Sequence, residues 1–148
     1  LDGGKEGIIV EGGHDLHGIE IDCGDTPDAV PALAVLGCYA QGIMKLYNIA
    51  ASRMKETDRS KTIAQELRKM GAHIDEEEDS LTIYHSPLHG ATIDGHNDHR
   101  IVMATTCAAL GAEGPSFIDS VDHVGVSFPR FYEEMKGIGA DIIRLAEK

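Results

Sequence analysis

Three short polar clusters combine charged side chains with the predicted start of a helix. They are Lys55-Glu56-Thr57-Asp58-Arg59, Asn97-Asp98-His99-Arg100 and Pro27-Asp28. The free N–H groups and the positive dipole end of a helix start favour anions. Arginine and lysine placed there make a site for phosphate or carboxylate. Neighbouring carboxylates, such as that of Asp28, are available as bases.

Each cluster also has a structural interpretation, because it offers residues that could simply cap its helix: Thr57 or Asp58, Asn97 or Asp98, and Asp28. His99, taken alone, fits a structural histidine. Arg100, however, leads directly into the apolar run 101–103. An arginine on the shoulder of a buried helix is costly without an anionic partner. That partner could be a ligand.

Apolar periodicity predicts the helices that must position these clusters. Residues 28–41 are apolar nearly all round, which indicates a helix buried on most sides. Pro31 fits only in its first turn. A second helix is predicted over 57–70 and ends before Gly71. One stripe of it carries Ile63, Ala64, Leu67 and Met70.

The remaining elements are shorter. Further helices are predicted over 98–110 and 129–136, and strands over 115–118 and 141–145. Residues 72–75 and 81–84 predict a hairpin, with the acidic run 76–79 as its solvated turn. Two of the three cysteines, Cys38 and Cys107, lie in runs predicted as buried helix.

A duplicated unit organises these elements. The stretch from Asp28 resembles the stretch from Asp98, about 70 residues later. Each has an acidic start, an apolar helical run, a stop containing Gly and a strand-like run. The block 66–74 likewise parallels 133–142. Two copies are too few for an open solenoid, so we expect one layered α/β domain over residues 1–148.

Composition excludes several classes of protein. The 148 residues are 42% apolar and 26% charged, which is ordinary for a globular domain. A net charge of −12 argues against a nucleic-acid surface. No apolar run approaches the length of about 18 residues that a membrane helix needs. No CxxC spacing indicates a zinc site or a disulfide framework, so we expect no metal and a reducing, cytoplasmic setting.

The order of the motifs resembles the enolpyruvylshikimate-phosphate synthase family. The motifs are TPDAVPALAVL at 26–36, KETDR at 55–59, ELRKMGA at 66–72, NDHR at 97–100 and SFPRFYEEM at 127–135. The resemblance covers roughly residues 18–142 and implies an α/β fold of repeated helix-and-strand units. It also implies that the chain, which begins with Leu1, is most of the C-terminal domain of a longer enzyme.

The resemblance further implies a reaction between phosphoenolpyruvate and shikimate 3-phosphate, with no cofactor. Arg59 and Arg100 would clamp phosphoenolpyruvate, and His99 would line the same pocket. Asp28 would take the proton of the attacking 5-hydroxyl, and Glu56 would serve in proton transfer at the methylene carbon. Lys55 would reach the shikimate side. We expect a monomer whose missing N-terminal domain supplies further cations, so that this piece alone is inactive.

One position departs from the family pattern. Val126 stands where members often carry a lysine, two residues before the Phe-Pro pair. Four alternatives remain open. They are an anion-binding half-domain without chemistry, the cell-wall enolpyruvyl transferase, an RNA-end cyclase and a purely structural fragment. The acidic composition disfavours the RNA enzyme, and the KETDR motif disfavours the cell-wall enzyme.

Overall fold

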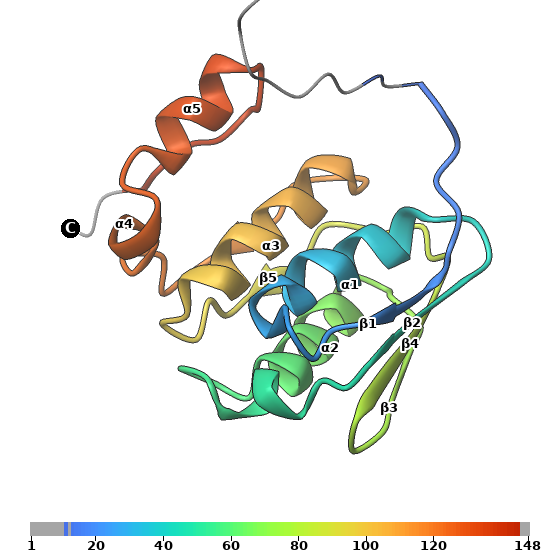
Figure 1. Cartoon of the computed structure of the whole chain (residues 1–148). Coiled ribbons are helices and arrows are strands. Elements are labelled where there is room, and N and C mark those ends of the chain that lie inside the picture. The colour runs from blue at the N-terminus through green and yellow to red at the C-terminus, as the bar shows by residue number, and fades with distance from the viewer. Residues whose placement is uncertain (1–10, 12, 146–148) are drawn as a thin grey trace, which may run out of the picture.

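Short strands and helices alternate along residues 11 and 13–145, which this computed structural model describes (Figure 1). The helices are α1 (Val30–Tyr39), α2 (Arg59–Lys69), α3 (His99–Gly111), α4 (Val124–Ser127) and α5 (Phe131–Gly137), with 3₁₀ segments η1 (Pro27–Ala29) and η2 (Ala50–Met54). The alternation confirms the predicted α/β class.

The strands form two small sheets. The four-stranded sheet has the order β1-β2-β4-β3, from β1 (Glu20–Asp22), β2 (Ile43–Tyr47), β3 (Ile74–Glu76) and β4 (Ser80–Tyr84). In it β1 and β2 run parallel, whereas β4 is antiparallel to both β2 and β3. A second sheet pairs β5 (Thr92–Ile93) in parallel with β6 (Phe117–Ile118). The predicted hairpin is therefore confirmed as β3–β4.

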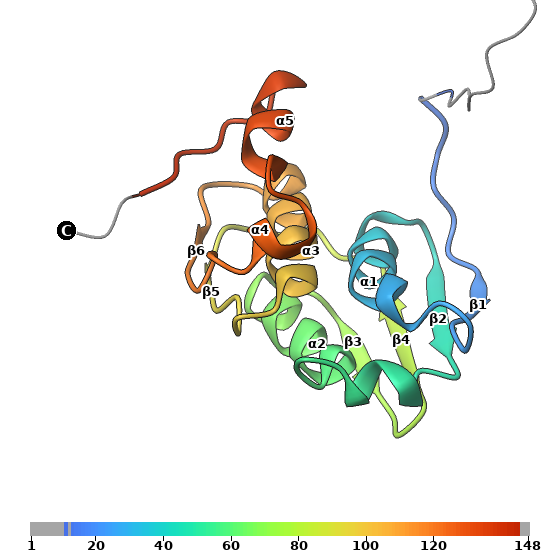
Figure 2. The same cartoon turned by 60° about the vertical axis from the view of Figure 1, so that its left-hand side comes forward.

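The core lies between the four-stranded sheet and the helices. Helix α1 packs on β2 and β4 with one side and on α2 and α3 with the other (Figure 2). Its burial is as predicted, since Val30, Ala34 and Cys38 are fully buried, and Pro31 lies in its first turn. Burial raises the pKa of the Cys38 thiol to about 12, so this cysteine stays protonated as a packing residue.

Helix α2 follows its predicted stripe. Ile63, Leu67 and Met70 are fully buried, and the helix ends where Gly71 adopts a φ of +94°. Its exposed side carries Arg68 and Lys69 at the last turn, where cations suit the negative dipole end. With this stripe buried, the N-terminal end of α2 and the KETDR motif lie beside the N-terminal end of α3, where Arg59 contacts Asp98.

The duplication is visible in the backbone. Gly18 donates to the carbonyl of Gln41, and Gly90 donates to that of Glu113 in the same way. A methyl group on Gly18 would lie 2.2 Å from the Ile43 carbonyl oxygen, and one on Gly90 would lie 2.1 Å from that of Pro115. Only glycine allows the chain to pass this closely, so both units use it at the same place.

The second unit is shorter than predicted. Residues 141–145 form no strand, which makes that prediction wrong. No described strand lies beside them, so an extended segment there would leave its N–H and C=O groups unpaired. The helix predicted over 129–136 is confirmed as α5. Cys107 is exposed on α3, which corrects its predicted burial.

None of the helices formed by residues 11 and 13–145 has both the length and the apolar character needed to cross a membrane.

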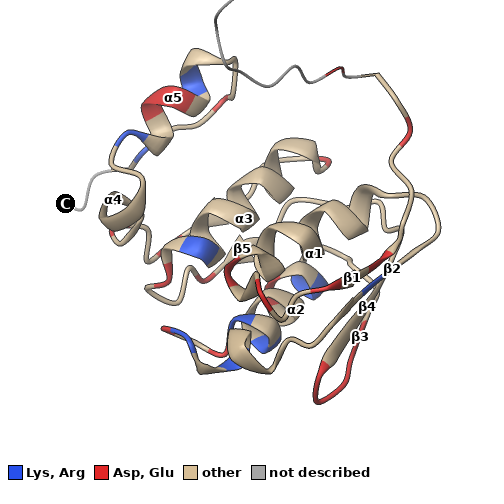
Figure 3. Cartoon of the chain, in the orientation of Figure 1, with Lys and Arg blue, Asp and Glu red and all other residues tan. Residues whose placement is uncertain are grey.

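Figure 3 shows how the charged residues are distributed over the elements. Basic residues mark η2, the start of α2 and the start of α3, whereas acidic residues lie around β1 and the turn between β3 and β4.

Candidate functional site

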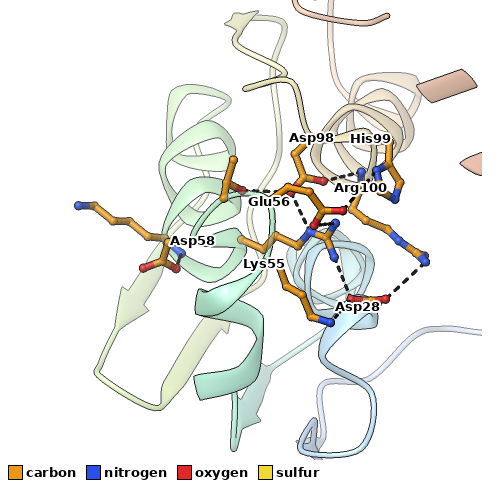
Figure 4. A network of polar contacts seen from close by, with 10 residues as sticks. Asp28, Lys55, Glu56, Asp58, Asp98, His99 and Arg100 are labelled. Atoms are coloured by element: carbon orange, nitrogen blue, oxygen red, sulfur yellow. Dashed lines mark hydrogen bonds and ion pairs between the residues drawn. The ribbon is translucent and has the colours of Figure 1, made fainter. Parts of the chain in front are cut away.

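The guanidinium of Arg59 is the centre of the site, although its side chain is only 2% exposed. Its Nε donates to Asp98 at 2.8 Å, and its Nη1 donates to Asp28 at 2.8 Å (Figure 4). Its Nη2 donates to Glu56. Burying a charge is costly unless it is paired and hydrogen-bonded. Here carboxylates from three separate stretches of chain meet that requirement.

Asp98 is the buried partner in this arrangement. It caps α3 by accepting from the Arg100 amide at 2.9 Å, and it also accepts from the Thr57 hydroxyl at 3.1 Å. Burial alone would raise the pKa of Asp98. Hydrogen bonds from Arg59, the Arg100 amide and Thr57 outweigh it and hold that pKa below the ordinary value of 3.8. Asp98 is therefore a carboxylate at neutral pH.

Asp28 is the half-exposed carboxylate that the cations share. Lys55 Nζ lies 3.1 Å from its Oδ1, Arg59 Nη1 lies 2.8 Å from the same oxygen, and Arg100 Nη2 lies 3.7 Å from Oδ2. The hydrogen bond from Lys55 lowers the pKa of Asp28, burial opposes this, and the charges of Lys55, Arg59 and Arg100 lower it further. The group is ionised and faces outward.

Arg100 and His99 complete the cluster from the first turn of α3. Arg100 is partly exposed, and its Nε is buried without a hydrogen-bond partner among the described residues. A buried donor left without an acceptor costs free energy, and an incoming anion would satisfy it. His99 Nδ1 lies 3.9 Å from Glu56 Oε1, and the ring is mostly buried. Donors thus remain for a ligand on this side of the cluster.

Two helices begin beside this cluster, since Arg59 is the first residue of α2 and Asp98 precedes α3. Asp58 caps α2 by accepting from the Lys61 amide at 3.0 Å, and Asp98 caps α3. Of the capping alternatives, Asp58 and Asp98 are therefore the ones used. Asp28 caps nothing, because the residue at that position before η1 is Thr26, which makes no side-chain hydrogen bond. The positive dipole ends of α2 and α3 add to the field of the arginines.

All six predicted site residues lie in this one cluster: Asp28, Lys55, Glu56, Arg59, His99 and Arg100. The sequence interpretation missed Asp98 as the buried partner of Arg59, and Thr57 as its second donor. The signal was available, since the duplication aligns Asp98 with Asp28. Capping of α3 already explains an aspartate at this position, so the sequence alone does not reveal its second role.

Convergent charge marks this site better than surface shape does. Two surface hollows lie elsewhere, one lined by Asp22, Gly24, Asp25, Thr26 and Asn48, the other by Arg53, Glu76, Glu77 and Glu78. The cluster itself is a filled face on which cations already hold carboxylates. Apart from Arg100 Nε, which has no partner among the described residues, these cations are paired with carboxylates, so a ligand would have to replace some of these pairs.

Two other expectations concern charge near the site. Val126 lies on α4 with its side chain 78% exposed. Because valine carries no charge, this position supplies no cation. Among residues 11 and 13–145, no group of three His, Cys, Asp or Glu side chains could hold a metal ion. The absence of a metal or cofactor from the reaction stays a prediction.

Comparison with known proteins shows which family this chain resembles. The family model described as EPSP synthase (3-phosphoshikimate 1-carboxyvinyltransferase) matches residues 1–135. The 3-phosphoshikimate 1-carboxyvinyltransferase of Methanocella arvoryzae is 49% identical over 135 residues, which is 91% of this chain and 32% of that protein. The enzyme of that name from Methanocaldococcus jannaschii is 47% identical over 139 residues, which is 93% of this chain and 32% of that protein.

Solved structures agree with the sequence matches. EPSP synthase from Acinetobacter baumannii superimposes with a TM-score of 0.79 at 34% identity, over 85% of this chain and 31% of that one. The enolpyruvyl transferase NikO from Streptomyces tendae shares the fold, with a TM-score of 0.74 at 23% identity over 90% of this chain and 30% of that one. This chain, which spans about a third of the length of these relatives, belongs to the EPSP synthase family.

Proposed function

We propose that this chain is part of a 3-phosphoshikimate 1-carboxyvinyltransferase. The enzyme moves the enolpyruvyl group of phosphoenolpyruvate to the 5-hydroxyl of shikimate 3-phosphate and releases phosphate. The observation that carries the proposal is the meeting of Lys55, Arg59 and Arg100 around the Asp28 carboxylate. Both substrates are anions, and clustered guanidinium groups bind carboxylate and phosphate through paired hydrogen bonds.

The binding roles follow from which cations have free donors. Arg100 has the buried, unpartnered Nε and the long contact to Asp28, so it takes phosphoenolpyruvate with the least rearrangement. Arg59 is held by Asp28, Glu56 and Asp98, and it binds the same anion once Asp28 or Glu56 gives up its hydrogen bond. His99 lines the pocket beside them. Lys55, on the other side of Asp28, reaches toward the shikimate moiety and the charge that develops during reaction.

The proton transfers use the half-exposed carboxylates. Glu56 serves at the methylene carbon of phosphoenolpyruvate, which gains a proton as the 5-hydroxyl oxygen attacks the neighbouring carbon. Asp28 takes the proton that leaves this hydroxyl. The tetrahedral adduct then expels phosphate and loses a methyl proton, which restores the double bond. Asp28 is a weak base while three cations hold it, and it becomes a stronger one when Arg100 turns to the substrate.

The rest of the site comes from the remainder of the protein. Residues 1–148 form one domain, most of the C-terminal one, and the N-terminal domain supplies further cations and the site for the shikimate phosphate. The enzyme works as a cytoplasmic monomer and needs neither cofactor nor metal. Closure of the two domains excludes water and completes the catalytic set.

The test is Arg100→Ala in the full-length protein that contains this chain, followed by a coupled phosphate-release assay. We expect kcat/KM for phosphoenolpyruvate to fall on the order of 100-fold. Arg130→Ala is the matched control, because the exposed Arg130 has Glu134 as its one ion-pair partner within residues 11 and 13–145. Wild-type turnover that survives Arg100→Ala would refute the proposed site. Phosphoenolpyruvate binding without any phosphate release would favour a binding module instead.

A further inference from the structure

The loop between β5 and α3 has an unusual backbone. His96 and Asn97 have φ values of +51° and +52°, in the left-handed region that few residues other than glycine occupy. Two such residues in succession persist only where the surroundings hold them. The residues that follow directly are Asp98, His99 and Arg100, so this loop sets where half of the anion site lies.

Glu66, on α2, holds the loop from outside the site. Its side chain is only 2% exposed. It accepts from the Asp94 amide at 3.0 Å, and the Nε2 atom of His96 lies 3.0 Å from its Oε1. His96 is fixed at its other end too, because its amide donates to Asp94 Oδ1 at 2.7 Å. Glu66 therefore forms hydrogen bonds with both Asp94 and His96, at the start of the loop.

The charge state of Glu66 fits this role. Burial alone would raise the pKa of Glu66, but hydrogen bonds from Lys69, His96 and the Asp94 amide outweigh burial and lower that pKa below 4.5. A carboxylate can only accept hydrogen bonds, so His96 donates through Nε2. Among the described residues Glu66 makes no hydrogen bond or ion pair with any of the six site residues, so its connection to His99 and Arg100 runs through the loop.

We propose that Glu66 is a positioning residue that fixes Arg100 and His99 for anion binding, an inference that rests on the proposed function. Helix α2 grips the turn into α3 at two points. Arg59 bonds Asp98 at the site, and Glu66 bonds Asp94 and His96 behind it. Without the hydrogen bonds to Glu66, the left-handed residues relax, and Arg100 no longer keeps a fixed direction toward phosphoenolpyruvate.

Lys69 offers a matched control on the same carboxylate. Its Nζ lies 2.9 Å and 2.7 Å from the two oxygens of Glu66, but it does so from the solvent side, and its side chain is 46% exposed. Lys69→Gln removes charge pairing from Glu66 without touching the loop. His96→Asn removes the bond between the His96 ring and Glu66, together with the longer 3.8 Å approach of His96 Nδ1 to Asp94 Oδ2. It keeps the backbone, because asparagine tolerates a positive φ.

The experiment compares Glu66→Gln, His96→Asn and Lys69→Gln in the full-length enzyme by steady-state kinetics and amide hydrogen exchange. For the first two we expect KM for phosphoenolpyruvate to rise about 10-fold, with kcat and KM for shikimate 3-phosphate within about threefold. The amides of residues 94–100 should exchange faster. Lys69→Gln should leave all these values within about twofold of wild type.

A purely structural role would give a different result. It would alter both KM values and kcat together, or act equally in Lys69→Gln, and either outcome overturns the proposal. Unchanged KM and exchange in Glu66→Gln and His96→Asn would overturn it as well, and His96→Asn decides alone if Glu66→Gln does not fold. If the wild type shows no turnover, the proposed function fails. Faster exchange at 94–100 would then still support the loop restraint, and unchanged exchange would refute it.

Discussion

The pairing of Arg59 with Asp98 combines deep burial with opposite charge. Removing one member of such a pair leaves the other buried and uncompensated, which is far costlier than losing an exposed pair. Loss of the Asp98 carboxylate would also remove the cap of α3, because this group accepts the hydrogen bond of the Arg100 amide. The proposed binding site and the stability of the fold therefore share these side chains, so a loss of activity on substitution needs a folding control.

Substitution of Asp98 should show this in the pH dependence of stability. Because the pKa of Asp98 is lower in the folded state than its ordinary value of 3.8, its contribution is present above that value and is lost as pH falls through the folded pKa. We expect Asp98→Asn to lower the free energy of unfolding by about 3–5 kcal/mol at pH 7. That deficit should shrink as pH falls below about 4.

Urea unfolding of the full-length wild type and variant between pH 7 and pH 2 measures this difference. The carboxylates with lowered pKa values that do not contact Arg59, including Asp22 and Glu66, titrate in both proteins and cancel in the comparison. A deficit that stays constant across the acid range would show that the charge of Asp98 does not provide its contribution.

At the scale of elements, Arg53 joins η2 to the β3–β4 hairpin. Its Nε and Nη2 donate to the carbonyls of Glu78 and Glu77 at 2.8 Å and 2.6 Å, and its Nη1 pairs with Glu76 and with Asp58, the cap of α2. The acidic turn is exposed, as predicted, but it is not merely solvated. The turn also binds the guanidinium of Arg53, and this contact fixes the segment that precedes the KETDR motif.

Loss of this junction should cost stability. We expect Arg53→Gln to lower the free energy of unfolding by about 1–3 kcal/mol, because the acceptors on the turn and the α2 cap lose a charged donor. Chemical denaturation of the full-length protein measures the change. Lys61→Gln, on the exposed side of α2, is the control and should change stability by less than about 0.5 kcal/mol. Equal effects would argue against a specific junction.

The close backbone approach in each repeated unit gives a second test at this scale. Gly90→Ala places a methyl group 2.1 Å from the Pro115 carbonyl oxygen, so the strands must separate. We expect a loss of about 1–3 kcal/mol or more, measured by thermal unfolding. Gly137→Ala in α5 meets nothing within 4 Å and should be neutral or stabilising. A tolerated alanine at Gly90 would contradict the geometry.

Most elements could be predicted from sequence because their periodicity is strong. The stripe of α2 and the apolar run of α1 reflect burial that any partner surface would require. Residues 141–145 failed because a strand is defined by its neighbour, and local β propensity does not say whether one is present. Asp98 was underestimated for a related reason: its cap is a local signal, whereas its bond to Arg59 spans 39 positions.

At the scale of the whole molecule, the chain carries its own core, and the proposed function makes its charged cluster one part of a larger active site. The cations Lys55, Arg59 and Arg100 are matched by Asp28, Glu56 and Asp98 in this cluster. Under the proposed function, two substrates with several negative charges need more positive charge than this balance leaves. We therefore expect the other part of the protein to contribute to binding.

Accordingly, we expect the chain expressed by itself to release no phosphate from phosphoenolpyruvate and shikimate 3-phosphate. The coupled assay on the separate chain measures this, with circular dichroism to establish that it is folded. The full-length enzyme at equal concentration is the positive control. Steady turnover by the chain alone would mean that its one cluster suffices.

The ion pairs of Arg59 also constrain how the molecule assembles. They close loops of 31 and 39 residues, to Asp28 and Asp98. Each closure costs conformational entropy of the chain, which the ion pair offsets only once it has formed. The β3–β4 hairpin can form early from contacts near in sequence, whereas this junction waits for three remote stretches. We therefore expect this cluster to assemble late in folding, after the hydrophobic layers have formed.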